Sequence, residues 1–171
     1  MRGLMMDYPL AVPALIRRAE RLFPDRTLVT RRPDRSLARL TYAQAIDRAR
    51  RLAVALGDLG IRPGDRVATL AWASHQHLEA YLAVPWMGAV LHTLNLRLHH
   101  DDLAYIATDA ADRVLLVDES LLPLVERFRD RAPFEHVIVI GGGPAPDLKV
   151  GPTRGGSAIG GGPAPDLKVG P

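Results

Sequence analysis

Cysteine is absent from this 171-residue sequence, and lysine occurs only at Lys149 and Lys168. Without cysteine the chain has no disulfide, no thiolate nucleophile and no Cys-based zinc site. No run reaches the roughly 20 apolar residues that a helix needs to cross a bilayer. The N-terminus also lacks the small-residue cleavage pattern of a signal peptide. We therefore expect a cytoplasmic protein with no transmembrane segment.

The chain also lacks a large excess of either positive or negative charge. The 22 basic and 19 acidic side chains leave a formal charge of only +3. The bases are spread singly along the sequence rather than gathered into a stripe, so we expect no nucleic-acid partner. With 47% hydrophobic and 24% charged residues, the composition is that of an ordinary folded protein, and the length favours one core.

Local signals near the N-terminus predict a hairpin followed by a helix. Two strand-like runs, at 27–32 and 36–40, are separated by Pro33 and Asp34. Thr41 and Gln44 fit a capping box, in which each side chain satisfies a free backbone amide at a helix start. The apolar spacing that follows predicts a long amphipathic helix, and Gly60 is a natural stop for it.

Strand-like and helix-like segments then alternate. Apolar runs begin near positions 67, 89, 113 and 137, and the segments between them predict helices over 75–87, 101–110 and 121–131. Right-handed crossovers connect strands in this order, so we expect an α/β fold with a mostly parallel sheet and helices on both faces. Ligands of such sheets bind beyond the carboxyl ends of the strands.

The residues after position 140 differ from the rest. The segment from Ile140 to Pro152 recurs letter for letter from Ile159 to Pro171. Each copy has too few large apolar side chains to offset the ordering entropy of its glycines. We therefore expect a folded domain over residues 1–140 and a disordered, Gly/Pro-rich tail over 141–171. A binding motif presented twice for avidity is the other interpretation of the repeat.

No segment carries a strong phosphate-binding or catalytic pattern. Thr153–Ser157 has the glycines of a phosphate loop, but it lacks a lysine and follows no predicted strand. Lys149 and Lys168 occupy equivalent positions in the two repeats, which does not suit a specifically placed catalytic amine. No serine stands in a Gly-x-Ser-x-Gly turn.

The six histidines form only weak patterns. His75 and Glu79 are four apart, whereas His77 points elsewhere on the same predicted helix, and two ligands are too few for zinc. His92 lies in an apolar strand and is expected to be a hydrogen-bonded structural residue. The run His99-His100-Asp101-Asp102 is a candidate for a weak surface metal site or, alternatively, a solvated helix start. We therefore assign no catalytic, cofactor-binding or metal-binding residue from the sequence.

Three longer runs resemble the adenylate-forming acyl-CoA synthetases of the AMP-binding superfamily. They are LTYA at 40–43, ALGDLGIRPGDRVATL at 55–70 and HLEAYLAVPWMGAVLHTLN at 77–95. The resemblance covers essentially Gly3 to Ile140, and the HLEAY and GAVLHTLN runs are most similar to medium- and long-chain fatty acid:CoA ligases. Three positions depart from the family pattern: Ala73 replaces an asparagine, Leu96 a proline, and His99 a serine or threonine cap.

The resemblance implies ATP-dependent adenylation of a fatty acid, followed by transfer of the acyl group to CoA, with magnesium neutralising phosphate charge. The family's phosphate loop ending in Pro-Lys-Gly, its Thr-Glu motif and its C-terminal domain with a catalytic lysine have no counterpart in these residues. We therefore expect an incomplete, N-terminal part of the enzyme that is inactive alone and needs no cofactor itself. The alternative is a non-catalytic α/β module for dimerisation or other interactions.

Overall fold

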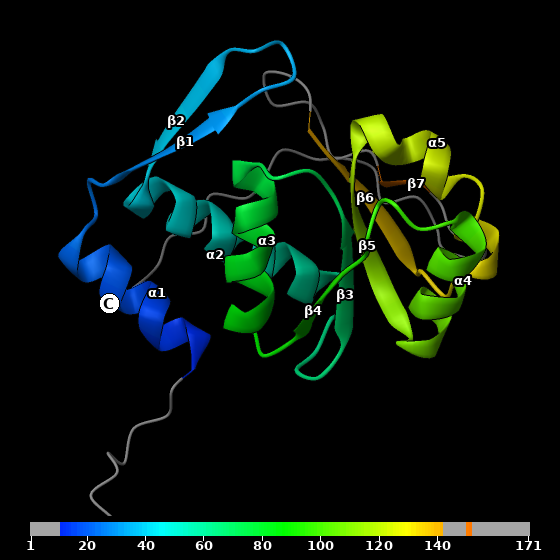
Figure 1. The fold of residues 1–171 in the computed structure, drawn as a ribbon. Helices are drawn as coiled ribbons and strands as arrows, with labels where there is room; N and C mark the ends of the chain where they lie inside the picture. The colour runs from blue at the N-terminus through cyan, green and yellow to red at the C-terminus, as the bar shows by residue number, and fades with distance from the viewer. Residues whose placement is uncertain (1–10, 142–149, 152–171) are drawn as a thin grey trace, which may run out of the picture.

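A computed structural model describes residues 11–141 and 150–151 of the chain. Figure 1 shows a sheet with helices on both sides and a separate hairpin that projects beyond the first three helices. The elements, in chain order, are α1 (Val12–Leu22), β1 (Thr27–Arg31), β2 (Leu37–Thr41), α2 (Tyr42–Asp58), β3 (Arg66–Leu70), α3 (His75–Trp86), β4 (Val90–Thr93), α4 (His100–Asp109), β5 (Asp112–Asp118), α5 (Leu122–Val125), β6 (His136–Ile140) and β7 (Val150–Gly151). Two short 3-10 turns, Glu119–Leu121 and Arg129–Arg131, flank α5.

The main sheet has the strand order β4-β3-β5-β6-β7. The pairs β3–β4, β3–β5 and β5–β6 are parallel, whereas β7 runs antiparallel to β6. The predicted α/β class and mostly parallel sheet are therefore confirmed. The chain moves from β3 outward to β4 and then returns to the other side of β3 as β5, so the direction of winding reverses between β3 and β5.

Alternate residues of the central strands belong to two hydrophobic cores, one on each face of the sheet, because successive side chains of a strand point to opposite faces. Val67, Val114 and Leu116 are fully or almost fully buried and pack with residues of α2 and α3. Leu115 and Val117 are fully buried and pack on the opposite face, with residues of α4 and α5. These strands read as nearly continuous apolar runs in the sequence because both of their faces are covered.

The predicted hairpin and capping box are both confirmed. Strands β1 and β2 pair antiparallel as a two-stranded sheet. Thr41 Oγ1 accepts a hydrogen bond from the backbone N–H of Gln44 at 3.2 Å, and Gln44 Oε1 accepts one from the backbone N–H of Thr41 at 2.9 Å. Gly60 follows the end of α2 with a φ of +86°, a left-handed conformation that suits a glycine there.

The helix predicted over 121–131 is wrong in its length. It is divided into the first 3-10 turn, the four-residue α5 and the second 3-10 turn. The backbone N–H groups of Arg127 and Phe128 bond to carbonyls three residues earlier, those of Leu124 and Val125. This tighter winding ends the α-helix. Phe128 is buried there, edge-on to Phe134 at 6.2 Å between ring centroids.

The predicted tail at 141–171 lies outside the described residues, apart from Gly141 and the two residues of β7. The boundary between a folded part and a tail therefore stays a prediction. Among the described residues, no helix is long and apolar enough to cross a membrane.

Candidate functional site at the carboxyl edge of the sheet

The winding reversal between β3 and β5 marks the place where a ligand of this sheet is expected. The carboxyl ends of parallel strands meet at one edge, and crossovers that leave in opposite directions open a crevice there. Strand β3 ends at Leu70 and is followed by Ala71 and Trp72, whereas β5 ends at Asp118. Trp72 and Asp118 therefore belong to the two strand ends that flank the reversal.

A hydrogen-bonded chain of three side chains joins these two strand ends. The indole Nε1 of Trp72 donates to Ser120 Oγ at 3.0 Å. Ser120 Oγ in turn donates to Asp118 Oδ1 at 2.7 Å, and the same oxygen accepts the Ser120 backbone N–H at 3.0 Å. Trp72 remains 50% exposed. The arrangement presents an indole surface and a carboxylate, and Ser120 links the two.

Gly141 closes this edge from the end of β6. It has a φ of +123°, in the region that L-residues other than glycine rarely adopt. A Cβ at this position would lie 3.7 Å from Asp118 Oδ2. The strand end therefore approaches the carboxylate closely, and a side chain at position 141 would be strained by the backbone conformation.

A second polar pair lies beneath the edge, between β3 and the first turn of α3. Thr69 is buried, and its Oγ1 lies 3.0 Å from His77 Nε2. Ser74 caps the helix by accepting the backbone N–H of His77 at 3.2 Å. Burial lowers the pKa of His77, and a hydrogen bond with the Trp72 backbone opposes this shift. His77 is therefore held as a neutral side chain that orients the loop carrying Trp72.

The geometry of this edge favours binding over covalent chemistry. Ser120 donates its hydroxyl proton to Asp118 and accepts from Trp72, so it has no histidine base to activate it as a nucleophile. Asp118 is a carboxylate without a second carboxylate in its hydrogen-bonded chain to share acid and base roles. An indole face and a carboxylate suit contact with an apolar or cationic group better than with a phosphate.

The histidine and glutamate predicted to share a helix face do so, but they do not form a metal site. Glu79 is 6% exposed and accepts from Arg48 of α2, with Nε at 2.6 Å and Nη2 at 3.3 Å. His75 Nδ1 is buried without a hydrogen-bond partner among the described residues. Burial lowers the pKa of His75. Glu79 is thus committed to an ion pair between two helices.

The structure brings together three of the four residues of the candidate metal site, His99, His100 and Asp101. Arg131 reaches the same atoms: its Nη1 donates to Asp101 Oδ1 at 2.5 Å, and its Nη2 lies 3.1 Å from His100 Nδ1. His99 caps α4 by accepting the Asp101 backbone N–H at 3.4 Å. Arg131 holds the pKa of Asp101 below its usual value. The cluster joins the start of α4 to the second 3-10 turn, and the positive charge that it binds is the guanidinium of Arg131.

His92 has the structural role expected of it. Its Nδ1 lies 2.9 and 2.8 Å from the two carboxylate oxygens of Asp112, which is completely buried. Burial raises the pKa of Asp112, and the hydrogen bond from His92 opposes that shift. The pair ties the edge strand β4 to the start of β5, across β3.

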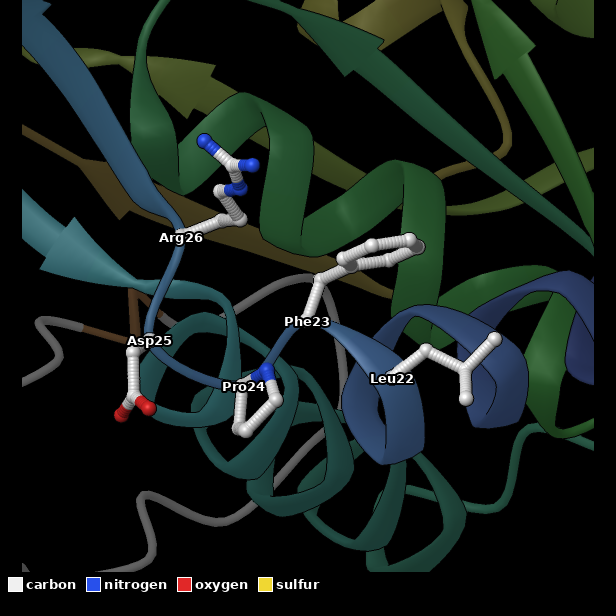
Figure 2. Close-up of a pocket in the computed structure, with 5 residues that line it drawn as sticks. All are labelled: Leu22, Phe23, Pro24, Asp25 and Arg26. Atoms are coloured by element: carbon white, nitrogen blue, oxygen red, sulfur yellow. The ribbon is translucent and has the colours of Figure 1, made fainter.

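Three of the remaining candidates fall outside the part of the chain that the structure describes. Thr153–Ser157, Lys149 and Lys168 lie outside the described residues. A shallow, open hollow is lined by Leu22–Arg26, the turn between α1 and β1. Figure 2 shows the Phe23 ring directed toward α3, whereas Asp25 points away from it. This hollow has no cluster of polar groups converging on a common point, as a small-molecule site requires.

Comparison with known proteins shows the family to which this chain belongs. The family model described as AMP-binding enzyme matches residues 16–164. The chain belongs to the AMP-binding enzyme family. The resemblance found in the sequence is thereby confirmed, and the incomplete α/β fold corresponds to an N-terminal portion of these enzymes.

Curated relatives of this AMP-binding chain include fatty acid CoA ligases. The long-chain-fatty-acid–CoA ligase of Thermus thermophilus is 47% identical over 137 residues, which cover 80% of this chain and 25% of the relative. The medium-chain-fatty-acid–CoA ligase of Ectopseudomonas oleovorans is 37% identical over 140 residues, covering 82% and 26%. The chain thus spans about a quarter of the length of these relatives.

Solved structures of acyl-CoA ligases share the fold. The anthranilate CoA ligase AuaEII, in complex with anthranoyl-AMP, superimposes with a TM-score of 0.71 at 28% identity, covering 78% of this chain and 26% of that one. A fatty acyl CoA synthetase of Mycobacterium tuberculosis gives a TM-score of 0.69 at 25% identity, covering 76% and 26%. This AMP-binding chain is therefore similar in both sequence and fold to one portion of much longer ligases.

The edge formed by Trp72, Ser120 and Asp118 was not predicted from the sequence. Trp72 and Ser120 are 48 positions apart, and no motif links them. The one available signal was that Asp118 ends an apolar strand, since polar residues at carboxyl strand ends are candidates for ligand contact.

Proposed function

We propose that this chain is the N-terminal, non-catalytic part of a cytoplasmic medium- or long-chain fatty acid:CoA ligase. In the whole ligase, ATP and magnesium would serve adenylation of the fatty acid, and CoA would accept the acyl group. This chain would contribute the sheet, its two helical layers and the edge at Trp72 to that enzyme. By itself it would require no cofactor and form no acyl-CoA.

The charge of the carboxyl edge is the observation that supports the proposal most. Enzymes lower reaction barriers by roughly 8–23 kcal/mol, and phosphoryl chemistry depends on cations and backbone amides placed around the phosphates. Here the strand ends carry Asp118 and Glu119, and the described residues contain no lysine. Two carboxylates without a lysine nearby make this edge poorly suited to hold an anionic triphosphate.

Titration of the purified chain with magnesium-ATP by calorimetry tests the proposal. The Thermus thermophilus ligase, as a complete relative, is the positive control. We expect no saturable heat for the present chain and a saturable one for the control. Saturable binding at one site per chain would contradict the proposal, because the chain would then hold the nucleotide without the remainder of a ligase.

The alternative function, an interaction module, is favoured by one observation. Strand β4 forms an edge of the main sheet, and its Val90 is 49% exposed. An uncovered sheet edge presents backbone groups with which another chain can pair. Light scattering over a range of protein concentrations separates the two functions. A rise in mass with concentration would favour the module, and a constant monomer mass would count against it.

A further inference from the structure

The charge of this chain is divided unevenly along its length. Residues 11–66 contain 13 arginines and six acidic residues, a formal charge of +7 with histidine neutral. Residues 67–141 contain five arginines and ten acidic residues, a formal charge of −5. The net charge of +3 therefore conceals a basic first part, comprising α1, the β1–β2 hairpin and α2, followed by an acidic second part.

The hairpin gathers much of this positive charge. Its four arginines all have exposed side chains: Arg31, Arg32, Arg35 and Arg39. Arginines elsewhere in the described part of the chain form ion pairs, among them Arg48, Arg50, Arg51, Arg113 and Arg131. Asp34, the acidic residue of the turn, accepts two hydrogen bonds from Ser36. Four of the arginines therefore lie on one projecting element, the β1–β2 hairpin (Figure 1).

The outward face of the hairpin combines arginine with aliphatic side chains. Val29 lies directly opposite Arg39, and Leu37 directly opposite Arg31. Val29 is 51% exposed and Leu37 54%. Two of the three cross-strand pairs on this face therefore have one aliphatic and one cationic member, and the third is Thr27 with Thr41. Arginine stems can lie along an apolar layer while their guanidinium groups stay at its charged boundary.

We propose that this hairpin face docks on the surface of an anionic phospholipid bilayer. Negative headgroups complement Arg31 and Arg39 on this face and Arg32 and Arg35 at the turn, and the two aliphatic side chains enter the boundary between headgroups and acyl chains. The proposal does not depend on the function proposed above, although a lipid surface would be a source of fatty acid for a ligase.

Other occupants fit this face less well. Single-stranded nucleic acid is bound by aromatic side chains on which bases stack, and the outward face has none. The C-terminal segment 141–171 carries Lys149, Arg154 and Lys168 against Asp147 and Asp166, so it offers no negative charge to the arginines. A second copy offers the acidic part of the chain, but surface ion pairs without apolar burial contribute little to association.

Vesicle flotation of the full chain tests the proposal. Vesicles of phosphatidylcholine alone are compared with vesicles that also contain phosphatidylglycerol, at low and at high salt. We expect binding only to the vesicles with phosphatidylglycerol, and weaker binding at high salt because the surface potential is screened. Equal binding to both vesicle types, or no binding to either, would overturn the proposal.

Two double variants assign the binding to the hairpin face. Since each basic residue near an anionic surface contributes about fivefold to partitioning, R31Q/R39Q should weaken binding roughly 25-fold. The control R62Q/R97Q removes the same charge from exposed positions outside the hairpin and should bind almost as the parent does. An equal loss in the control would show that net charge, not this face, governs binding. Thermal melts confirm folding, and the single variants R31Q and R39Q, each expected to weaken binding about fivefold, replace the double variant if that one is unfolded.

The aliphatic pair distinguishes a bilayer from other polyanions. V29S/L37S keeps every charge, so it should weaken vesicle binding but leave binding to a DNA duplex of matched charge unchanged. If this variant binds vesicles as well as the parent, the face recognises negative charge alone and the lipid proposal is wrong. If light scattering shows that the chain self-associates through the hairpin and that R31Q/R39Q abolishes this, the occupant is a second copy and the proposal is equally overturned.

Discussion

Two residues far apart in sequence, Arg48 and Glu79, show how burial decides the importance of an ion pair. Glu79 lies on α3 with only 6% of its surface exposed, and Arg48 of α2 covers it with a two-point contact. Removing the arginine leaves a buried carboxylate without its main partner. Arg51 and Asp47 form an exposed pair on the same helix, and such pairs contribute little.

The variant R48M should therefore lower the free energy of unfolding by roughly 1–3 kcal/mol, because half-exposed Arg48 lets water replace only part of the lost contact. The matched variant R51M should change it by less than about 0.5 kcal/mol. Urea denaturation of the three proteins measures both values. Equal effects of the two substitutions would contradict the account of Glu79 as a buried charge.

The pKa shifts of His75 and His77 predict how stability depends on pH. Burial lowers the pKa of both below the ordinary value of 6.5. Between the folded and the unfolded pKa, the unfolded chain binds more protons, so the free energy of unfolding falls as the pH drops below about 6.5. Replacing both with glutamine should flatten this part of the profile, measured by urea denaturation at each pH. A slope that persists in H75Q/H77Q would show that other groups cause it.

At the scale of the element, the start of α2 was predictable because its determinants are local. Thr41 and Gln44 bond reciprocally across three positions, as the sequence spacing indicates. The hairpin that precedes them was likewise predictable from two strand-like runs around Pro33 and Asp34. In both cases the residues that form the contact are close in sequence, so no knowledge of tertiary packing was needed.

A double-mutant cycle measures the capping box. T41A should destabilise the chain by about 1 kcal/mol, since it leaves a helix amide without an acceptor. The double variant T41A/Q44A should lose less unfolding free energy than the sum of the losses in T41A and Q44A, because either substitution alone already breaks the reciprocal pair. Thermal or urea unfolding gives the values. Strictly additive losses would mean that the two hydrogen bonds form independently.

The segment after β5 was not predictable in detail because its winding depends on tertiary contacts. Leu121, Val125 and Phe128 have the spacing of one helix face, a pattern that is compatible with a continuous helix. The structure instead tightens the chain at Arg127 and Phe128, and the Phe128 ring packs against Phe134 beneath the sheet. That partner lies beyond the predicted helix, so periodicity alone could not identify it.

Truncation of Phe128 tests this packing. F128A should cost about 3–5 kcal/mol of unfolding free energy, because it leaves a cavity in the core formed with α4. F23A removes the same ring from a position that is 45% exposed, and should cost less than about 1 kcal/mol. Urea midpoints at a constant m-value provide the comparison. A small loss for F128A would mean that the segment is not anchored as described.

At the scale of the whole molecule, strand order explains both the success and the failure of the sequence-based predictions. Alternating apolar runs were enough to predict a parallel sheet with covered faces. They could not predict that β5 would return beside β3, and it is this return that places Ser120 within reach of Trp72. The candidate edge therefore arises from topology, whereas the family was predictable because long runs of residues carry the resemblance.

Pyrophosphate release is the measurement that tests the central claim most directly, namely that this member of the AMP-binding family carries no complete adenylation site of its own. The purified chain is incubated with ATP, magnesium and a medium- or long-chain fatty acid, and release is compared with a reaction lacking the acid. We predict equal release in both reactions. Release that depends on the fatty acid and scales with the concentration of the chain would contradict the account.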